Sequence, residues 1–256
     1  MSKSIVDTIY HAQKGAYEIL KVTETHTPFS IEDAYEYQRE LMARYLANGS
    51  LLSGYKMGLT SREKMSQMGV DSPIYGVLLE EMDLRGAPLK VKSLIHPKAE
   101  PEIAVKLKED VPSDADEQTL EKAIGWIAPA IEIIDSRYKD FKFTMADVVA
   151  DNCSSAKYAL GAWLEYPVNG KHIDEIELSM KINKKVVAEG KATAVLGSPL
   201  SSLREQQLSL SKAGIQLMKG QVVLTGAVTA AMMLSPGDIV QIETNGIGSV
   251  ELICTE

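Results

Sequence analysis

The chain has 256 residues, of which 45% are hydrophobic and 24% are charged, values typical of a globular protein with one large domain or two modest ones. Its formal net charge of -8 argues against nucleic acid as a main partner, because a phosphate backbone requires a basic surface. Two distant cysteines, and no apolar run of membrane-spanning or signal-peptide type, exclude a disulfide framework and predict a cytoplasmic protein that does not enter a membrane.

The first 50 residues predict a helical N-terminal region. Apolar residues at helical spacing indicate a helix over residues 4–21. Ser30 is a candidate N-cap with Asp33 three residues later, and it predicts a second helix that ends near Asn48 and Gly49. We therefore expect a helical region over residues 1–50 and a β-rich catalytic domain over residues 51–256, joined in one compact unit.

After residue 51, short apolar runs alternate with turn-forming residues, which favours strands. Asn183-Lys184 and Asn245-Gly246 separate alternating runs and predict hairpin turns. The sequence thus predicts a mixed, β-rich α+β fold. Strands are expected over residues 54–59, 102–107, 128–134, 158–162, 176–182, 186–188, 222–225, 239–244 and 250–254, and helices over residues 62–68, 117–124, 144–148 and 200–213.

Two glutamates, Glu100 and Glu102, stand one residue apart in a segment with strand character. Residues i and i+2 of a strand point to the same face, so the two carboxylates would repel each other unless a cation lay between them. Oxygen ligands suit Mg, Mn and Ca, so one interpretation is a divalent metal site. The other is an exposed strand face with two solvated charges.

Glu132 lies in the middle of an apolar stretch, between Ile131 and Ile133. A carboxylate buried there without a partner would be costly. The pattern therefore predicts either an ion pair, with Arg137 or a lysine, or a third metal ligand beside the Glu100 and Glu102 pair. Three carboxylates would leave open positions on an octahedral metal, where a substrate could chelate.

Further polar residues follow short apolar segments. Lys56 lies in a glycine-bounded strand, where it could neutralise a substrate carboxylate or move a proton, or could simply reach water from a strand edge. Residues 151–155 predict either a plain turn or a substrate contact. Residues 224–227 could present backbone N–H groups to an anion. Cys153 has no His or Asn at a spacing that would support a nucleophile.

Several stretches, taken together and in this order, resemble the fumarylacetoacetate hydrolase superfamily, and within it the branch that holds hydratases and decarboxylases of aromatic meta-cleavage pathways. Residues 64–76, 96–102 and 135–143 are more similar to the decarboxylases than to the hydratases. The resemblance spans nearly the whole chain. The matching stretches are residues 54–61, 64–76, 96–105, 130–143, 149–155, 196–200, 224–226 and 246–250.

The resemblance implies a mixed β-roll with flanking helices and a helical N-terminal region. It also implies roles for single residues at the matching positions. Glu100, Glu102 and Glu132 match the family's ligands for Mg2+ or Mn2+, and Lys56 matches its active-site lysine. Residues expected to bind substrate, from their positions in the motifs that line the family's pocket, are Asp71, Ser155 and Thr225.

The activity implied by the resemblance is metal-dependent decarboxylation of a small 2-oxo dicarboxylic acid, 2-oxohex-3-enedioate, to 2-hydroxypenta-2,4-dienoate. The alternative is hydration of that dienoate on the same scaffold. Both reactions would use the same carboxylates and the same metal-bound dienolate. The resemblance further implies a homo-oligomer that associates with the hydratase of its pathway.

Overall fold

Two β-sheets and seven α-helices make up the part of the chain that the computed structural model describes, residues 4–68 and 71–256. Gly69 and Val70, which belong to the matching stretch 64–76, lie outside the described residues. The helices are α1 (Ile5–Gly15), α2 (Val22–Thr25), α3 (Ile31–Ala47), α4 (Arg62–Met68), α5 (Glu117–Ala123), α6 (Met145–Ala150) and α7 (Pro199–Lys212).

The larger sheet has eight strands in the order β2-β1-β10-β4-β5-β6, with β11 beside β4 and β7 beside β5. Most of its pairs are antiparallel, but β1 and β10 are parallel, so the sheet is mixed. These strands are β1 (Leu52–Gly58), β2 (Ile74–Leu79), β4 (Lys98–Leu107), β5 (Ile124–Ile134), β6 (Ser155–Leu160), β7 (Leu164–Glu165), β10 (Val222–Leu224) and β11 (Met232–Met233).

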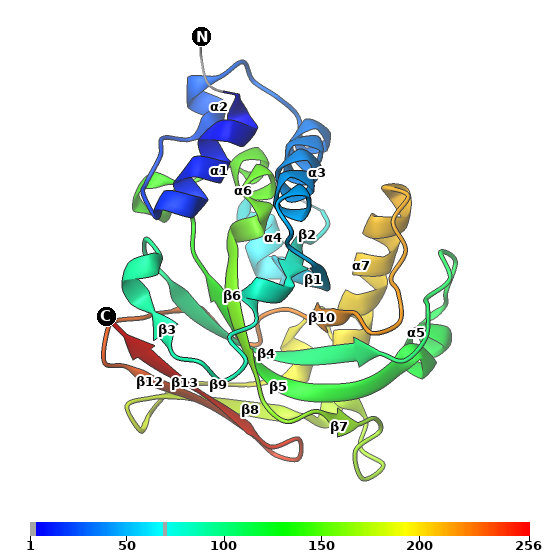
Figure 1. Cartoon of the computed structure of the whole chain (residues 1–256). Helices are drawn as coiled ribbons and strands as arrows, with labels where there is room; N and C mark the ends of the chain where they lie inside the picture. The colour runs from blue at the N-terminus through cyan, green and yellow to red at the C-terminus, as the bar shows by residue number, and fades with distance from the viewer. Residues whose placement is uncertain (1–3, 69–70) are drawn as a thin grey trace.

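The smaller sheet has five strands in the order β3-β13-β12-β8-β9 and lies at the bottom of Figure 1. Its hairpins turn at Asn183-Lys184 and around Asn245-Gly246, as predicted, and both residues of the first turn have a positive φ. Its strands are β3 (Leu89–Lys90), β8 (Glu177–Ile182), β9 (Lys185–Lys191), β12 (Ile239–Thr244) and β13 (Ser249–Thr255).

The main hydrophobic core contains one face of the larger sheet, the inner face of the smaller sheet and the apolar side of α7. Alternate residues of β4, such as Ile103 and Val105, point into this core, and Ile131 and Ile133 of β5 do the same. The residues between them, including the glutamates, therefore face the opposite side of the larger sheet. This alternation confirms the predicted α+β fold and assigns the glutamates to the non-core face.

A second hydrophobic cluster holds α1, α3 and α6 together above the larger sheet (Figure 1). Ser30 caps α3 in a capping box with Asp33, as its sequence predicts. The helix predicted over residues 4–21 is too long, because α1 ends at Gly15 and Ala16 adopts the left-handed conformation that terminates a helix. Ile19 instead pairs with the backbone on either side of Tyr138, which ties the N-terminal region to the catalytic part of the chain.

Candidate metal centre

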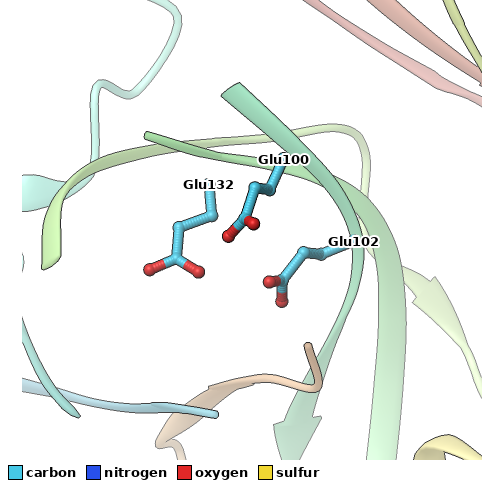
Figure 2. Close-up of side chains that lie close together, drawn as sticks. All are labelled: Glu100, Glu102 and Glu132. Atoms are coloured by element: carbon cyan, nitrogen blue, oxygen red, sulfur yellow. The ribbon is translucent and has the colours of Figure 1, made fainter. Parts of the chain in front are cut away.

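The register of β4 and β5 brings the three predicted glutamates together. Glu100 of β4 lies directly opposite Glu132 of β5, and Glu102 lies two residues along β4, on the same face. Figure 2 shows the three carboxylates pointing toward one another from these neighbouring strands. One oxygen of each lies within 4.8 Å of the others. The two long strands therefore build a three-carboxylate site from Glu132 and a pair of glutamates at least thirty positions earlier in the sequence.

The site fits a divalent cation. Glu102 and Glu132 are almost completely buried, with 0% and 1% of their surface exposed. Oε1 of Glu102 and Oε2 of Glu132 accept no hydrogen bond from any residue that the structure describes. Buried carboxylate oxygens normally have a partner, and hard oxygen ligands are those that Mg2+ and Mn2+ prefer. The interpretation of Glu100 and Glu102 as an exposed strand face is therefore wrong, because Glu102 is fully buried and Glu100 is half-buried beside it.

Lys56 of β1 supplies the only positive charge among the described residues that line the site cavity. Its Nζ lies 2.9 Å from Oε1 of Glu132, and its side chain is 3% exposed. The ion pair that the sequence left open for Glu132 is thus made with a lysine, whereas Arg137 pairs with Asp151 at 2.6 Å. Three carboxylates and one ammonium leave a formal charge of -2, which one divalent cation would neutralise.

The electrostatics of the site raise the pKa of Glu102 and that of Lys56, for different reasons. Burial, followed by the charges of Glu132 and Glu100, raises the pKa of Glu102 well above its usual range. Burial alone would lower the pKa of Lys56, but the surrounding negative charge, chiefly that of Glu132, outweighs burial and raises it. Lys56 is therefore an ammonium group, able to donate hydrogen bonds or a proton.

The segment of residues 224–227 holds the carboxylate of Glu102. The N–H of Gly226 donates a hydrogen bond of 2.8 Å to Oε2 of Glu102, which fixes the direction of its other oxygen. Gly226 has a φ of +118°, and a Cβ there would lie 2.4 Å from Oγ1 of Thr60. This position therefore requires glycine, and its N–H orients a carboxylate of the chain; the binding of a ligand anion by residues 224–227 stays a prediction.

A cavity of about 110 Å³ opens beside the glutamates. Glu100 and Lys56 line it, and most of the other described residues that line it are apolar. Ser154 belongs to the 151–155 segment that the sequence indicates, but it is not among the residues expected to bind substrate. It lines the cavity, and its buried Oγ has no hydrogen-bond partner among the described residues. The apolar wall consists of Leu59, Ile74, Ile134, Phe141, Phe143 and Val148.

Ser154 is held by a left-handed turn. Asn152, Cys153 and Ser154 have φ values of 51°, 54° and 58°, a conformation that costs a non-glycine residue about 1–2 kcal/mol. The side chain of Asn152 offsets this cost, since its Oδ1 accepts from the N–H of Val77 at 2.7 Å and its Nδ2 donates to the carbonyl of Val77 at 2.9 Å. The segment is thus a strained turn, one of the two interpretations that the sequence allowed, and it presents Ser154 to the cavity.

Replacing Asn152 with alanine is expected to lower the free energy of unfolding by about 2–4 kcal/mol, because two part-buried hydrogen bonds and the side chain suited to this φ are lost. Urea denaturation measures the change. Asn169 also has a left-handed φ, of 52°, but is exposed, so Asn169→Ala is the matched control and should change stability by less than about 1 kcal/mol. Equal effects of the two substitutions would contradict this role for Asn152.

Cys153 lines the cavity but is not activated. Its Sγ donates to the carbonyl of Tyr75 at 2.9 Å and accepts from Nε2 of Gln38 at 3.8 Å. Burial is the largest cause of a rise in its pKa to about 12. The thiol is therefore neutral at physiological pH, in agreement with the absence of a nucleophile signature in the sequence.

The raised thiol pKa predicts slow alkylation of the native protein. The second cysteine, Cys254, is also buried, and burial raises its pKa to about 11. At pH 8.5 the thiolate fraction of Cys153 should be on the order of a thousandfold lower in the folded than in the unfolded chain. Because the folded pKa is the higher one, this group stabilises the fold below about pH 9 and loses that contribution as the pH rises. Iodoacetamide labelling with and without urea tests this, and fast native labelling would contradict it.

None of the three residues predicted to bind substrate is among the described residues that line this cavity. Asp71 is exposed at the start of the segment leading into β2. Ser155 is buried, but its hydroxyl donates to the carbonyl of Asn152 and it lines a different cavity. Thr225 is buried with its hydroxyl donating to the carbonyl of Ile103. Substrate contacts by these residues stay predictions.

Comparison with known proteins agrees with this geometry. Residues 80–252 match the family described as fumarylacetoacetate (FAA) hydrolase C-terminal. A 4-oxalocrotonate decarboxylase of Pseudomonas putida is 38% identical over 251 residues, which cover 96% of this chain and 94% of that protein. A 2-keto-4-pentenoate hydratase of Paraburkholderia xenovorans is 32% identical over 247 residues, with coverage of 95% and 91%.

A solved structure is similar over almost the whole chain. It is that of the 4-oxalocrotonate decarboxylase from Pseudomonas putida G7 complexed with magnesium and adipate. The TM-score is 0.93 at 36% identity, and the match covers 98% of this chain and 95% of that one. Within the described residues, no helix has the length and apolar character needed to cross a membrane.

Proposed function

This chain belongs to the fumarylacetoacetate hydrolase family, and from that membership we propose that it is a lyase that removes carbon dioxide from 2-oxohex-3-enedioate to give 2-hydroxypenta-2,4-dienoate. The observation that carries the proposal is the buried cluster of Glu100, Glu102 and Glu132 beside the Lys56 ammonium. Identity is higher to three decarboxylases, at 36–38%, than to five hydratases, at 30–34%, which supports the carboxy-lyase over the hydro-lyase.

Glu100, Glu102 and Glu132 would hold a Mg2+ or Mn2+ ion. Such an ion supplies Lewis acidity toward the C1 carboxylate and the 2-oxo oxygen of the substrate, at the end of the molecule where negative charge develops. The protein contributes the positions of the three carboxylates. The pairing of ten residues of β4 with β5 fixes these positions, and the N–H of Gly226 orients Glu102.

In the proposed reaction the electrons move within the substrate, and Lys56 supplies the proton. When the C5–C6 bond breaks and the C6 carboxylate leaves as carbon dioxide, its electron pair forms C4=C5, and the C3=C4 pair shifts to C2=C3. The 2-oxo oxygen gains the negative charge and requires one proton to become the hydroxyl of the product. Lys56, which is protonated, donates that proton and takes another from water.

The described cavity wall suits a departing carboxylate. Phe141, Phe143 and Ile134 enclose the diene without offering hydrogen bonds from their side chains, so the charged carboxylate is desolvated and neutral carbon dioxide is favoured. The hydroxyl of Ser154 is positioned to hold one end of the substrate. A hydratase would need a base to activate water at C4, and the only carboxylate among the described lining residues is Glu100, which belongs to the metal site.

One assay distinguishes the two lyase activities. The purified protein, loaded with Mg2+ or Mn2+, is incubated separately with 2-oxohex-3-enedioate and with 2-hydroxypenta-2,4-dienoate. Release of carbon dioxide from the first substrate is the expected result. Consumption of the second substrate alone would identify a hydratase, and no reaction with either, with the metal shown to be bound, would overturn both.

The assembly implied by the sequence is part of the proposal. We propose a homo-oligomer that associates with the hydratase acting on its product, which would hand over the reactive dienol directly. Light scattering of the purified protein measures the oligomeric state. Co-purification with a tagged hydratase from the same source tests the association, and separate elution of the two enzymes would contradict it.

A further inference from the structure

Phe141 lines the cavity beside the glutamates from a strained turn. Asp140 and Phe141 both have a φ of 57°, a left-handed conformation that residues other than glycine disfavour. The N–H of Phe141 donates to the carbonyl of Tyr138 at 3.0 Å, and the N–H of Asp140 donates to Oε1 of Glu18, an exposed side chain, at 3.1 Å. Strained positions persist only where surrounding contacts hold them, so the place of the Phe141 ring depends on what packs against it.

The ring of Phe141 packs against side chains of β4 and of the residues around it. Nζ of Lys98, the first residue of β4, lies 3.8 Å from the ring centroid, inside the range of about 6 Å in which a cation attracts an aromatic face. The ring of His96 lies 5.0 Å away, tilted by 47°, and that of Phe143 lies 5.8 Å away. The contact with Lys98 is the shortest of the three, and it gains strength because this lysine is half-buried and has lost part of its hydration.

Lys98 lies on the same strand and the same face as two of the metal-site glutamates. It precedes Glu100 by two residues, so both side chains point to the non-core side of β4. Glu132 is paired with Lys56, and Lys98 forms no ion pair with a carboxylate within the described ranges 4–68 and 71–256. The strand that presents the metal-site carboxylates thus also presents, two residues earlier, the cation that contacts the wall of their cavity.

We propose that Lys98 is a positioning residue of the lyase, which holds the ring of Phe141 against the bound substrate. The inference rests on the proposed function, because the ring acts by keeping water away from the departing C6 carboxylate. When the ring is displaced, water enters the cavity and solvates that carboxylate, which slows the loss of carbon dioxide. The C1 end of the substrate, at the glutamates, is bound as before. Loss of Lys98 therefore lowers kcat and leaves KM nearly unchanged.

Steady-state kinetics with 2-oxohex-3-enedioate at saturating Mg2+ test the proposal. Lys98→Met, which removes the charge and keeps the length of the side chain, should lower kcat about tenfold and change KM less than about twofold. Lys98→Arg keeps a cation over the ring and should restore most of the lost kcat. The matched control is Lys106→Met, because Lys106 is also a half-buried lysine of β4, with its Nζ 5.9 Å from the ring centroid of Trp126. An equal effect of the two methionine variants, or no rescue by arginine, would overturn the proposal.

Fluorine NMR provides a readout that needs no substrate. The chain has three phenylalanines, so labelling with 4-fluorophenylalanine gives three resonances. In Lys98→Met the resonance of Phe141 should move, whereas that of Phe29, which packs on Tyr37, should stay in place. An inactive parent protein would overturn the proposed lyase, and an unmoved Phe141 resonance would overturn the role of Lys98, so the two failures are distinguishable. Thermal melting verifies that the variants are folded, and Lys98→Gln replaces Lys98→Met if the latter is not.

Discussion

The variant Glu102→Gln is expected to lose about a thousandfold in turnover, together with most of its affinity for Mg2+. Glutamine has the same shape and can still accept the hydrogen bond from Gly226, but it removes one of the three negative charges that face the cation. The Lewis acidity of a bound metal contributes several kcal/mol to the transition state, and about 4 kcal/mol corresponds to roughly a thousandfold in rate. Steady-state kinetics and Mg2+ titration measure the two losses.

In the absence of metal, Glu102→Gln is expected to increase the stability of the fold. Glu102 is fully buried beside two other carboxylates, so its removal as a charge should make the metal-free variant more stable than the metal-free parent. Mg2+ at a hundred times its Kd should stabilise the parent by about 2.7 kcal/mol and the variant by far less. Glu251→Gln, at an exposed position of β13, is the control, and equal stabilisation of the Glu102 variant by Mg2+ would contradict the metal site.

The variant Lys56→Met is expected to lose turnover by about 10²–10⁴-fold while it retains or gains affinity for Mg2+. The loss follows from the missing proton donor, a role that contributes rate factors of this size. The gain in affinity follows from charge, because the Lys56 ammonium repels a cation and occupies one oxygen of Glu132. Kinetics at saturating Mg2+ separate the two effects.

Stability provides an independent test of the same residue. Without its partner, Glu132 would be an uncompensated buried charge, so metal-free Lys56→Met should lose about 3–5 kcal/mol, and Mg2+ should restore much of it. Lys106→Met removes a half-buried lysine from the far end of β4 and serves as control. If turnover and Mg2+ affinity fell together in the Lys56 variant, Lys56 would be a structural support of the metal site and not a proton donor.

The sequence predicts the composition of the site well because strand periodicity and charge are local properties. The i, i+2 spacing of Glu100 and Glu102 and the apolar neighbours of Glu132 are visible without the fold. What periodicity cannot supply is the pairing register. That Glu132 lies opposite Glu100, and that its partner is Lys56 and not Arg137, depends on the strand order β1-β10-β4-β5.

Other details depend on backbone conformations that carry little sequence signal. Ala16 ends α1 in a left-handed conformation, which alanine does not favour, so the sequence predicts a helix that continues past it. Because residues Asn152 to Ser154 are left-handed, Ser154 and not Ser155 faces the cavity beside the glutamates. The side-chain hydrogen bonds of Asn152 to Val77 hold this conformation. The motif indicates this segment, and the serine that lines the cavity beside the glutamates is Ser154, whereas a substrate contact by Ser155 stays a prediction.

The strand order also determines when the site can form during synthesis. Lys56 and all three glutamates belong to the first 132 residues, but β10, which lies between β1 and β4, comprises Val222–Leu224. Because a ribosome releases the chain from its N-terminus, the sheet that brings Lys56 to the glutamates cannot close until about nine-tenths of the protein exists. An interrupted translation product would therefore contain every charged residue of the centre and still have no functional centre.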